Sequence, residues 1–351
     1  MGARAIANWS RQLDPLLSQW PRAVSRLSES LFRFRSAGLA ITVAVAPKAL
    51  IPDNSPRARE MPTLTFYWNA MHYRLPAFRA LRTAPMSLIV VLGCAHNAPG
   101  RESTPAHDSF TVLSKALGEA RAINIYTPPQ YRAAPRGTAE PLPVLYMPDG
   151  GLDEDFPHVV STVDSLIARG QIRPVIVVGV PNTQRRRDLT GPTLVATDSM
   201  IAPRVGGSTA FRRFLREELV PEVERRYRTT RERAIVGESL AGLFVVETFL
   251  EEPGLFAHYI ALDPSVWWNA GALVDSARAR LGAFDAAPRT LYLASSREAN
   301  IIVGTARLAA LLRTTSPPGL RWTYKPRPDL THATIFRALE TAALMDAFRS
   351  R

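Results

Sequence analysis

The chain is 351 residues long and 46% hydrophobic, which is enough to bury a full core and excludes a disordered or fibrous protein. Its formal net charge of +12 resembles that of a nucleic-acid-binding protein, but residues 1–93 hold 12 basic against 4 acidic residues, and no basic stripe interleaved with aromatic residues accompanies the charge. Its single cysteine, Cys94, excludes intrachain disulfides and multi-cysteine zinc sites. Nucleic-acid binding is therefore not predicted.

Residues 1–70 are rich in arginine and show no coherent hydrophobic period. We expect a poorly structured N-terminal extension here, or a reading frame assigned too early a start, since Met61, Met71 and Met86 all offer later ones. The apolar run at 37–46 is far shorter than the roughly 20 residues that a membrane-spanning helix needs. No transmembrane helix is predicted.

Residues 71–106 have the layout of an export signal followed by a linker. Arginines between positions 74 and 82 precede an apolar run at 86–93, and Cys94 follows that run directly. The segment resembles a bacterial lipoprotein signal in which Cys94 becomes lipidated, and the alternative is a buried strand that ends in a buried cysteine. We expect an exported protein, periplasmic or anchored to the membrane through Cys94, with a cytoplasmic location as the alternative.

Residues 107–351 alternate short β-rich runs with longer amphipathic stretches, which predicts an α/β domain with a mostly parallel sheet and helices on both faces. The clearest helix is 209–228, in which Pro221 predicts a kink or break. The long connection 181–207 is expected to be functional or disordered. Strands are predicted at 110–117, 122–127, 143–147, 175–180, 234–236, 259–262, 290–294 and 322–325.

A tight turn of small residues surrounds Ser239, where residues 237–242 read Gly-Glu-Ser-Leu-Ala-Gly. A β-branched strand precedes this turn and an apolar helix follows it, which is the arrangement of the nucleophile elbow of α/β hydrolases. Ala241 stands where that motif has its last glycine, and alanine is small enough to keep the packing. The pattern predicts that Ser239 is an exposed nucleophile.

A serine nucleophile needs a base, and His332 stands where an α/β hydrolase carries one, after the last strand and before a terminal helix at 333–348. A carboxylate should orient its ring. We favour Glu298, just beyond the strand 290–294. Asp263, after the preceding strand, is the first alternative, and Asp329 is the second.

Stabilising the oxyanion of a tetrahedral intermediate requires backbone N–H donors. The amide of Leu240, directly after the nucleophile, is expected to be one donor. We expect the amide of Gly151, in the glycine-containing turn after the strand 143–147, to be the other. The alternative for this second segment is an ordinary tight turn without a catalytic role.

Several blocks together resemble the putative-esterase group of α/β hydrolases, which includes siderophore esterases of the enterochelin-esterase and IroE type. The resemblance covers about residues 108–350. It implies hydrolysis of a carboxylic ester through an acyl-serine, without a metal or an organic cofactor. The chain departs from the group at Asp263, where relatives usually carry serine, and some members work with a serine-histidine dyad. The blocks are 143–150, 182–190, 214–221, the turn around Ser239, 264–269 and the His332-Ala-Thr-Ile segment.

The substrate is bounded only as a small-molecule ester. Trp267 and Trp268 offer walls for an aromatic acyl group, and Arg185 and Arg187 offer charges for an anionic one. The alternative is that the tryptophans belong to the core and the arginines are solvated. Siderophore, feruloyl and acetyl esters all remain candidates, as do an acyltransferase of the same fold and a non-catalytic surface lipoprotein that binds small molecules.

Overall fold

The computed structural model describes residues 32–36, 39–43, 104–135 and 137–350. It divides the chain into two units, Met1–Val91 and Leu92–Arg351. In the first unit, strands β1 (Phe32–Ser36) and β2 (Leu39–Val43) pair in antiparallel fashion, so two short strands lie where we expected no regular structure. The signal segment with Cys94 lies outside the described residues, and the domain boundaries stay a prediction.

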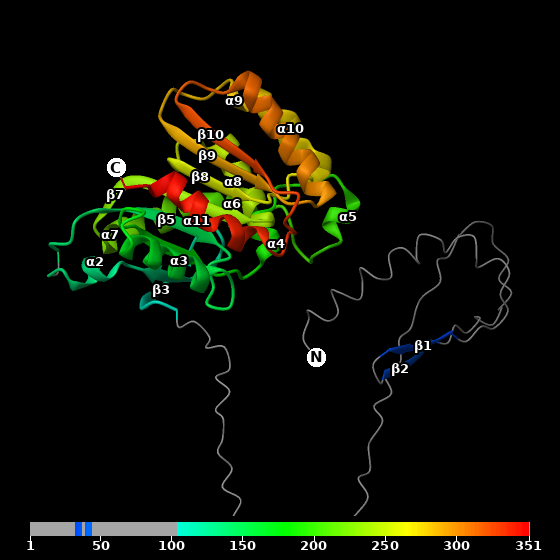
Figure 1. Cartoon of the computed structure of the whole chain (residues 1–351), viewed down its shortest axis with the longest axis horizontal. Coiled ribbons are helices and arrows are strands. Elements are labelled where there is room, and N and C mark those ends of the chain that lie inside the picture. Colours follow the sequence, from blue (N-terminus) through cyan, green and yellow to red (C-terminus); the bar gives the residue numbers. More distant parts are fainter. Residues whose placement is uncertain (1–31, 37–38, 44–103, 136, 351) are drawn as a thin grey trace, which may run out of the picture. The chain divides into compact units, whose positions relative to one another are not determined.

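The second unit is built on an eight-stranded sheet in the order β10-β9-β8-β7-β5-β6-β4-β3 (Figure 1). The strands from β10 to β6 pair in parallel, and β4 and β3 add an antiparallel edge. Every strand that the sequence predicted is present, which confirms the mostly parallel α/β domain. The strands are β3 (His107–Ser114), β4 (Glu119–Tyr126), β5 (Leu142–Pro148), β6 (Ile176–Val180), β7 (Thr229–Glu238), β8 (His258–Leu262), β9 (Arg289–Ser295) and β10 (Leu320–Pro326).

Helices cover both faces of this sheet, as the sequence predicted (Figure 1). Helices α3 (Phe156–Ala168) and α11 (Ile335–Phe348) bury their apolar side chains against one face. On the other face, α8 contributes a continuous run of buried residues to the larger core cluster. The helices of that face are α6 (Ser208–Phe214), α7 (Val220–Arg226), α8 (Leu240–Glu251), α9 (Ala272–Leu281) and α10 (Ala299–Thr315).

The predicted helix at 209–228 is present from Ser208 to Arg226 without a break, and only its hydrogen-bond pattern changes just before Pro221. Helix α6 passes into a π-helical segment at Leu215–Leu219, and α7 resumes at Val220. Proline has no backbone N–H to donate to the preceding turn, so the helical hydrogen-bond pattern changes before it. The long connection 181–207 also contains two short helices, α4 (Arg185–Leu189) and α5 (Ala196–Ser199), and is therefore ordered.

The predicted position of the first strand was wrong by about three residues. The strand β3 ends at Ser114, and Gly118, with φ +68°, closes the turn into β4 by donating its N–H to the Ser114 carbonyl oxygen at 3.0 Å. Glu218 accepts hydrogen bonds from the two backbone amides that follow Ser114. The strand therefore ends three residues earlier than the hydrophobic pattern suggests, at Ser114 instead of residue 117. Among the described residues, no helix is long and apolar enough to cross a membrane.

Candidate active site

Ser239 lies on a strained turn between β7 and α8. Its backbone has φ +61° and ψ −121°, a conformation that L-residues rarely adopt and that marks functional turns. The flanking glycines allow the turn, because a Cβ on Gly237 would lie 2.6 Å from the backbone of Ala241 and one on Gly242 only 3.0 Å from that of Leu262. The structure therefore has the backbone of a nucleophile elbow at Ser239.

His332 is oriented by Asp263. Its Nδ1 lies 2.6 Å from Asp263 Oδ2, and a carboxylate can only accept, so Nδ1 carries the proton and Nε2 is free to act as a base. Asp263 is fully buried, and Ser296 holds it in place by donating both its backbone N–H and its hydroxyl. The hydrogen bond to Asp263 raises the pKa of His332 above its ordinary value of 6.5, against the lowering effect of burial.

The structure corrects our choice of Glu298 as the orienting acid. Glu298 stands at the start of α10 and makes no side-chain hydrogen bond to His332 among the described residues, although its negative charge contributes to the raised pKa of that ring. Asp329, the other alternative, forms an exposed ion pair with Arg327. The carboxylate that contacts His332 is therefore Asp263, the first alternative from the sequence.

Ser239 and His332 lie at the same edge of the sheet. Strands β7 and β8 are parallel neighbours with Glu238 opposite Leu262, so Ser239 and Asp263 leave adjacent strands side by side. The backbone N–H of Ser239 also donates to Leu262 at 3.1 Å. No hydrogen bond joins the Ser239 hydroxyl to the His332 ring in the described part of the chain, and such bonds are often long in enzymes without substrate.

Gly151, one of the two expected oxyanion donors, lies in the turn after β5, and its N–H is already hydrogen-bonded within the protein. Gly150 must be glycine, because a Cβ there would lie 2.2 Å from the backbone N of Val180. The N–H of Gly151 donates to Glu154 Oε2 at 2.7 Å, so in this conformation it is not available to a substrate. The N–H of Leu240, at the start of α8, has no acceptor among the described residues and remains a suitable donor.

The two arginines expected to receive an anionic acyl group are already paired with acidic side chains. Arg185 donates two hydrogen bonds, each 2.7 Å long, to Asp149. Arg187 is largely buried and bonds Glu119 and Asp188, which leaves no free charge for a substrate and corrects its assignment. The pairing with Asp149 likewise gives Arg185 a structural contact, although 37% of its side chain stays exposed.

The two tryptophans also differ from each other. Trp268 is buried, and its Nε1 donates to the carbonyl oxygen of Gly191 at 2.9 Å, so it belongs to the core and not to a substrate wall. Trp267 is half-buried and packs against Trp268 with ring centroids 6.2 Å apart. Only Trp267 of this pair therefore keeps a surface that a substrate can contact.

Glu238 is a residue at this site that the sequence did not single out. It stands directly before Ser239 at the end of β7, and its Oε1 atom is buried with no hydrogen-bond partner among the described residues. Burial raises its pKa to about 7, with His332 and Arg185 acting in the opposite direction. Its position inside the serine motif was a signal that could have found it. The described residues contain no cluster of three or more His, Cys, Asp or Glu side chains suited to a metal ion.

Comparison with known proteins places the chain in a family. A model of the family described as "Putative esterase" matches residues 114–311. The chain is 38% identical over 109 residues to ferri-bacillibactin esterase of Bacillus subtilis, covering 27% of this chain and 38% of that protein. It is 29% identical over 179 residues to siderophore triacetylfusarinine C esterase of Aspergillus fumigatus, covering 48% of this chain and 59% of that protein. The chain thus spans less than two thirds of the length of either relative.

Solved structures give the same fold. An IroE-like serine hydrolase from Shewanella oneidensis superposes with a TM-score of 0.60 at 27% identity, over 69% of this chain and 78% of that one. A siderophore hydrolase of Aspergillus nidulans superposes with a TM-score of 0.61 at 20% identity, over 72% of this chain and 98% of that one, which is evidence for the fold alone. The domain therefore has the α/β-hydrolase fold.

Proposed function

Since this chain belongs to the putative-esterase family, whose model covers residues 114–311, we propose that it is a serine carboxylic ester hydrolase of the siderophore-esterase type. The observation that carries the proposal is the hydrogen bond of 2.6 Å from His332 Nδ1 to the buried Asp263, beside the elbow that presents Ser239. That bond fixes the imidazole tautomer with Nε2 unprotonated, which is the form that a general base requires.

In the proposed reaction, Ser239 Oγ attacks the ester carbonyl carbon while His332 Nε2 takes the hydroxyl proton. The negative charge that develops on the carbonyl oxygen is stabilised by the free N–H of Leu240. His332 then returns the proton to the leaving alcohol, and the acyl group stays on Ser239. A water molecule, deprotonated by His332, releases the acid and restores the serine. Asp263 stabilises the imidazolium throughout and does not take the proton.

A second oxyanion donor requires a rearrangement in this proposal. The Gly151 N–H can point at a substrate only after Glu154 releases it, and the side chain of Glu154 also accepts a hydrogen bond from Asn182 Nδ2 at 2.7 Å. Substrate entry would therefore displace one carboxylate to complete the oxyanion hole. A single donor is typically worth a factor of about 10² to 10³ in kcat, so completing the oxyanion hole should raise kcat by a factor of this order.

The proposed chemistry is tested with Ser239→Ala, which should lower kcat on a chromogenic short-chain ester by about 10⁴-fold or more and abolish labelling by a fluorophosphonate probe. Ser276→Ala is a matched serine-to-alanine control and should behave like wild type, because the Ser276 hydroxyl bonds only within its own helix α9. If the wild-type protein neither turns over the ester nor takes up the probe, it is a binding module and not a hydrolase.

The relatives' substrates support a siderophore ester, and a feruloyl ester is the second candidate. The second candidate has support from 27% identity over 159 residues to an endo-1,4-beta-xylanase/feruloyl esterase of Xylanibacter ruminicola. A panel of catecholate trilactone, triacetylfusarinine C, feruloyl and acetyl esters separates these classes by kcat/KM. The half-buried ring of Trp267 should favour aromatic acyl groups, so Trp267→Ala should lower kcat/KM for feruloyl esters and spare acetyl esters.

Export and lipidation at Cys94 complete the proposal and rest on the sequence pattern alone. In a bacterial host, Cys94→Ser should move the protein from the membrane fraction to the soluble fraction. Mass spectrometry of the mature amino terminus supplies the direct test. An unmodified peptide spanning positions 92–95 from membrane-extracted protein would exclude lipidation at this residue.

A further inference from the structure

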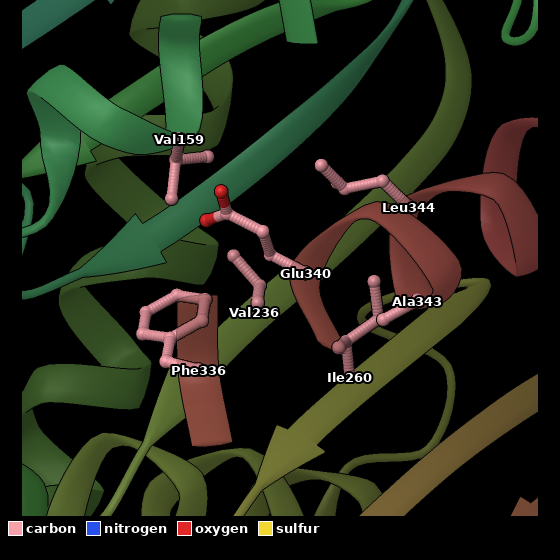
Figure 2. Close-up of a pocket in the computed structure, with 7 residues that line it drawn as sticks. All are labelled: Val159, Val236, Ile260, Phe336, Glu340, Ala343 and Leu344. Carbon is pink, nitrogen blue, oxygen red and sulfur yellow. The ribbon is translucent and has the colours of Figure 1, made fainter. Parts of the chain in front are cut away.

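Glu238 is placed so that its side chain shares a sheet face with α3 and α11. Side chains alternate along a strand, and Ala234 and Val236 of β7 belong to the core cluster under those two helices. Figure 2 shows Val236 pointing into the narrow gap between them, close to Val159 of α3 and Glu340 of α11. Glu238 is two residues further along the strand and therefore lies on the same face, at the edge where Ser239 leaves the sheet.

Glu238 lies opposite Leu262 on the neighbouring strand, so it stands one residue from Asp263, which holds His332. Four charged groups act electrostatically on Glu238: His332 from the segment before α11, Asp155 from the start of α3, Asp263 from the turn after β8, and Arg185 from α4. His332 in turn bonds Asp263 and is acted on by the negative charges of Glu238 and Glu298.

Each of the four neighbours already has a hydrogen-bonded partner. Asp155 bonds His158 at 3.2 Å, Arg185 bonds Asp149, and Asp263 bonds His332. Glu238 Oε1 has none among the described residues. Burying a carboxylate oxygen without a hydrogen-bond partner costs free energy. The free energy of the ionised Glu238 side chain therefore depends strongly on the charges of neighbouring groups. The neighbour whose charge changes during the proposed reaction is His332.

We propose that Glu238 is a positioning residue that acts through His332, where its carboxylate adds to the effect of Asp263 in stabilising the imidazolium and so shifts upward the pH above which the ring can serve as a base. The inference rests on the proposed function of Ser239 and His332. No proton passes to Glu238 in the reaction: it moves from Ser239 Oγ to His332 Nε2, and Glu238 supplies only a neighbouring charge. Burial holds the pKa of Glu238 at about 7, so the charge that assists the base is itself lost on the acid side of neutrality.

The rate of fluorophosphonate labelling of Ser239, measured from pH 5 to pH 9, tests this inference without needing the natural substrate. Wild type should show an acid limb set by His332. In Glu238→Gln the limb should shift to lower pH by about half a unit or more, because a neighbouring negative charge that raised the pKa of the ring is gone. Glu238→Asp keeps the charge and should keep the limb closer to its wild-type position.

Glu251→Gln is the matched control, since it removes a negative charge from the far end of α8, and its profile should overlay that of wild type. A Glu238→Gln profile that also overlays wild type would overturn the inference. Should that variant fail to fold, the NMR titration of the His332 ring in the wild-type protein decides: coupling to Glu238 gives two steps, and a single step contradicts it. Wild type that never labels at any pH would refute the proposed hydrolase instead, while the NMR titration would still test Glu238.

Discussion

Two aspartates of this domain share an unusual backbone conformation but bind different partners. Asp149 follows the last residue of β5 and Asp263 follows the last residue of β8, and both have a positive φ, of 57° and 48°. Both are buried, with 6% and 0% of their surface exposed. Asp149 receives two hydrogen bonds from Arg185, whereas Asp263 receives one from His332.

Because the partners differ, the pair of Asp149 and Arg185 has a structural role, whereas the pair of Asp263 and His332 can take part in proton transfer. A guanidinium does not lose its proton in a protein, so the pair of Asp149 and Arg185 is a fixed ion pair that holds the turn carrying Gly151. An imidazole exchanges its proton near neutral pH, and 39% of the His332 side chain is exposed. An aspartate with a positive φ therefore stabilises the structure at the end of β5, as Asp149, and supports the proposed chemistry at the end of β8, as Asp263.

Among changes to these two pairs, Asp263→Asn should have the largest effect on activity. An amide cannot hold the imidazole in the required tautomer or stabilise the imidazolium, so kcat on a chromogenic ester should fall by about 10³ to 10⁴-fold. Thermal unfolding measured alongside shows whether the protein remains folded. Glu298→Gln is the matched carboxylate-to-amide control and should stay close to wild type. The reverse result, with activity lost only in Glu298→Gln, would restore Glu298 as the acid.

Asp149→Asn should instead act mainly on stability. Arg185 loses the acceptor of a bidentate pair, and the free energy of unfolding should fall by about 1–3 kcal/mol in chemical denaturation. Its kcat should fall far less than that of Asp263→Asn. Arg185→Lys should also be destabilised, because an ammonium cannot reproduce the two parallel hydrogen bonds. Unchanged stability with a collapse of kcat would place Asp149 in the catalytic machinery.

Local signals explain which parts of this domain could be predicted from sequence. The eight strands follow from hydrophobic runs bounded by turns, and Ser239 from small residues between a strand and a helix. Even the change of hydrogen-bond pattern just before Pro221 follows from one missing N–H. These features depend on residues within a few positions of one another, so they can be predicted from short stretches of sequence.

The acid and the arginine contacts depend instead on residues far apart in the chain. Asp263 and Glu298 each follow one of two adjacent strands, and periodicity does not tell which turn reaches His332. The positive φ of Asp263 and the hydroxyl of Ser296 decide it. Arg187 likewise meets Glu119 across 68 positions of sequence, so its pairing could not be read from its surroundings in the chain.

His332 and Arg185, the partners of the two aspartates, should also differ in how they respond to pH. His332 must be neutral to act as a base, so kcat/KM should fall about tenfold per pH unit below its pKa, which the hydrogen bond to Asp263 raises above 6.5. A raised pKa means that this pair adds stability below pH 6.5 and loses that contribution as pH rises through the folded-state pKa. Asp149→Asn should leave the limb of the pH–rate profile in place, because Arg185 does not titrate in this range. A limb that moves with Asp149→Asn would show that the two pairs are coupled.

Ser296→Ala should give the smallest of these effects and tests how Asp263 is held. The change removes the hydroxyl that donates to Asp263 Oδ2 at 2.8 Å and leaves the backbone N–H of the same residue on Oδ1. Loss of one hydrogen bond to a buried charged group should cost about 1–2 kcal/mol in the free energy of unfolding. Because His332 keeps its contact with Asp263, kcat should fall only a few-fold, whereas Asp263→Asn removes that contact. A loss as large as that of Asp263→Asn would mean that the hydroxyl of Ser296, and not the strained backbone at Asp263, keeps the carboxylate in reach of the imidazole.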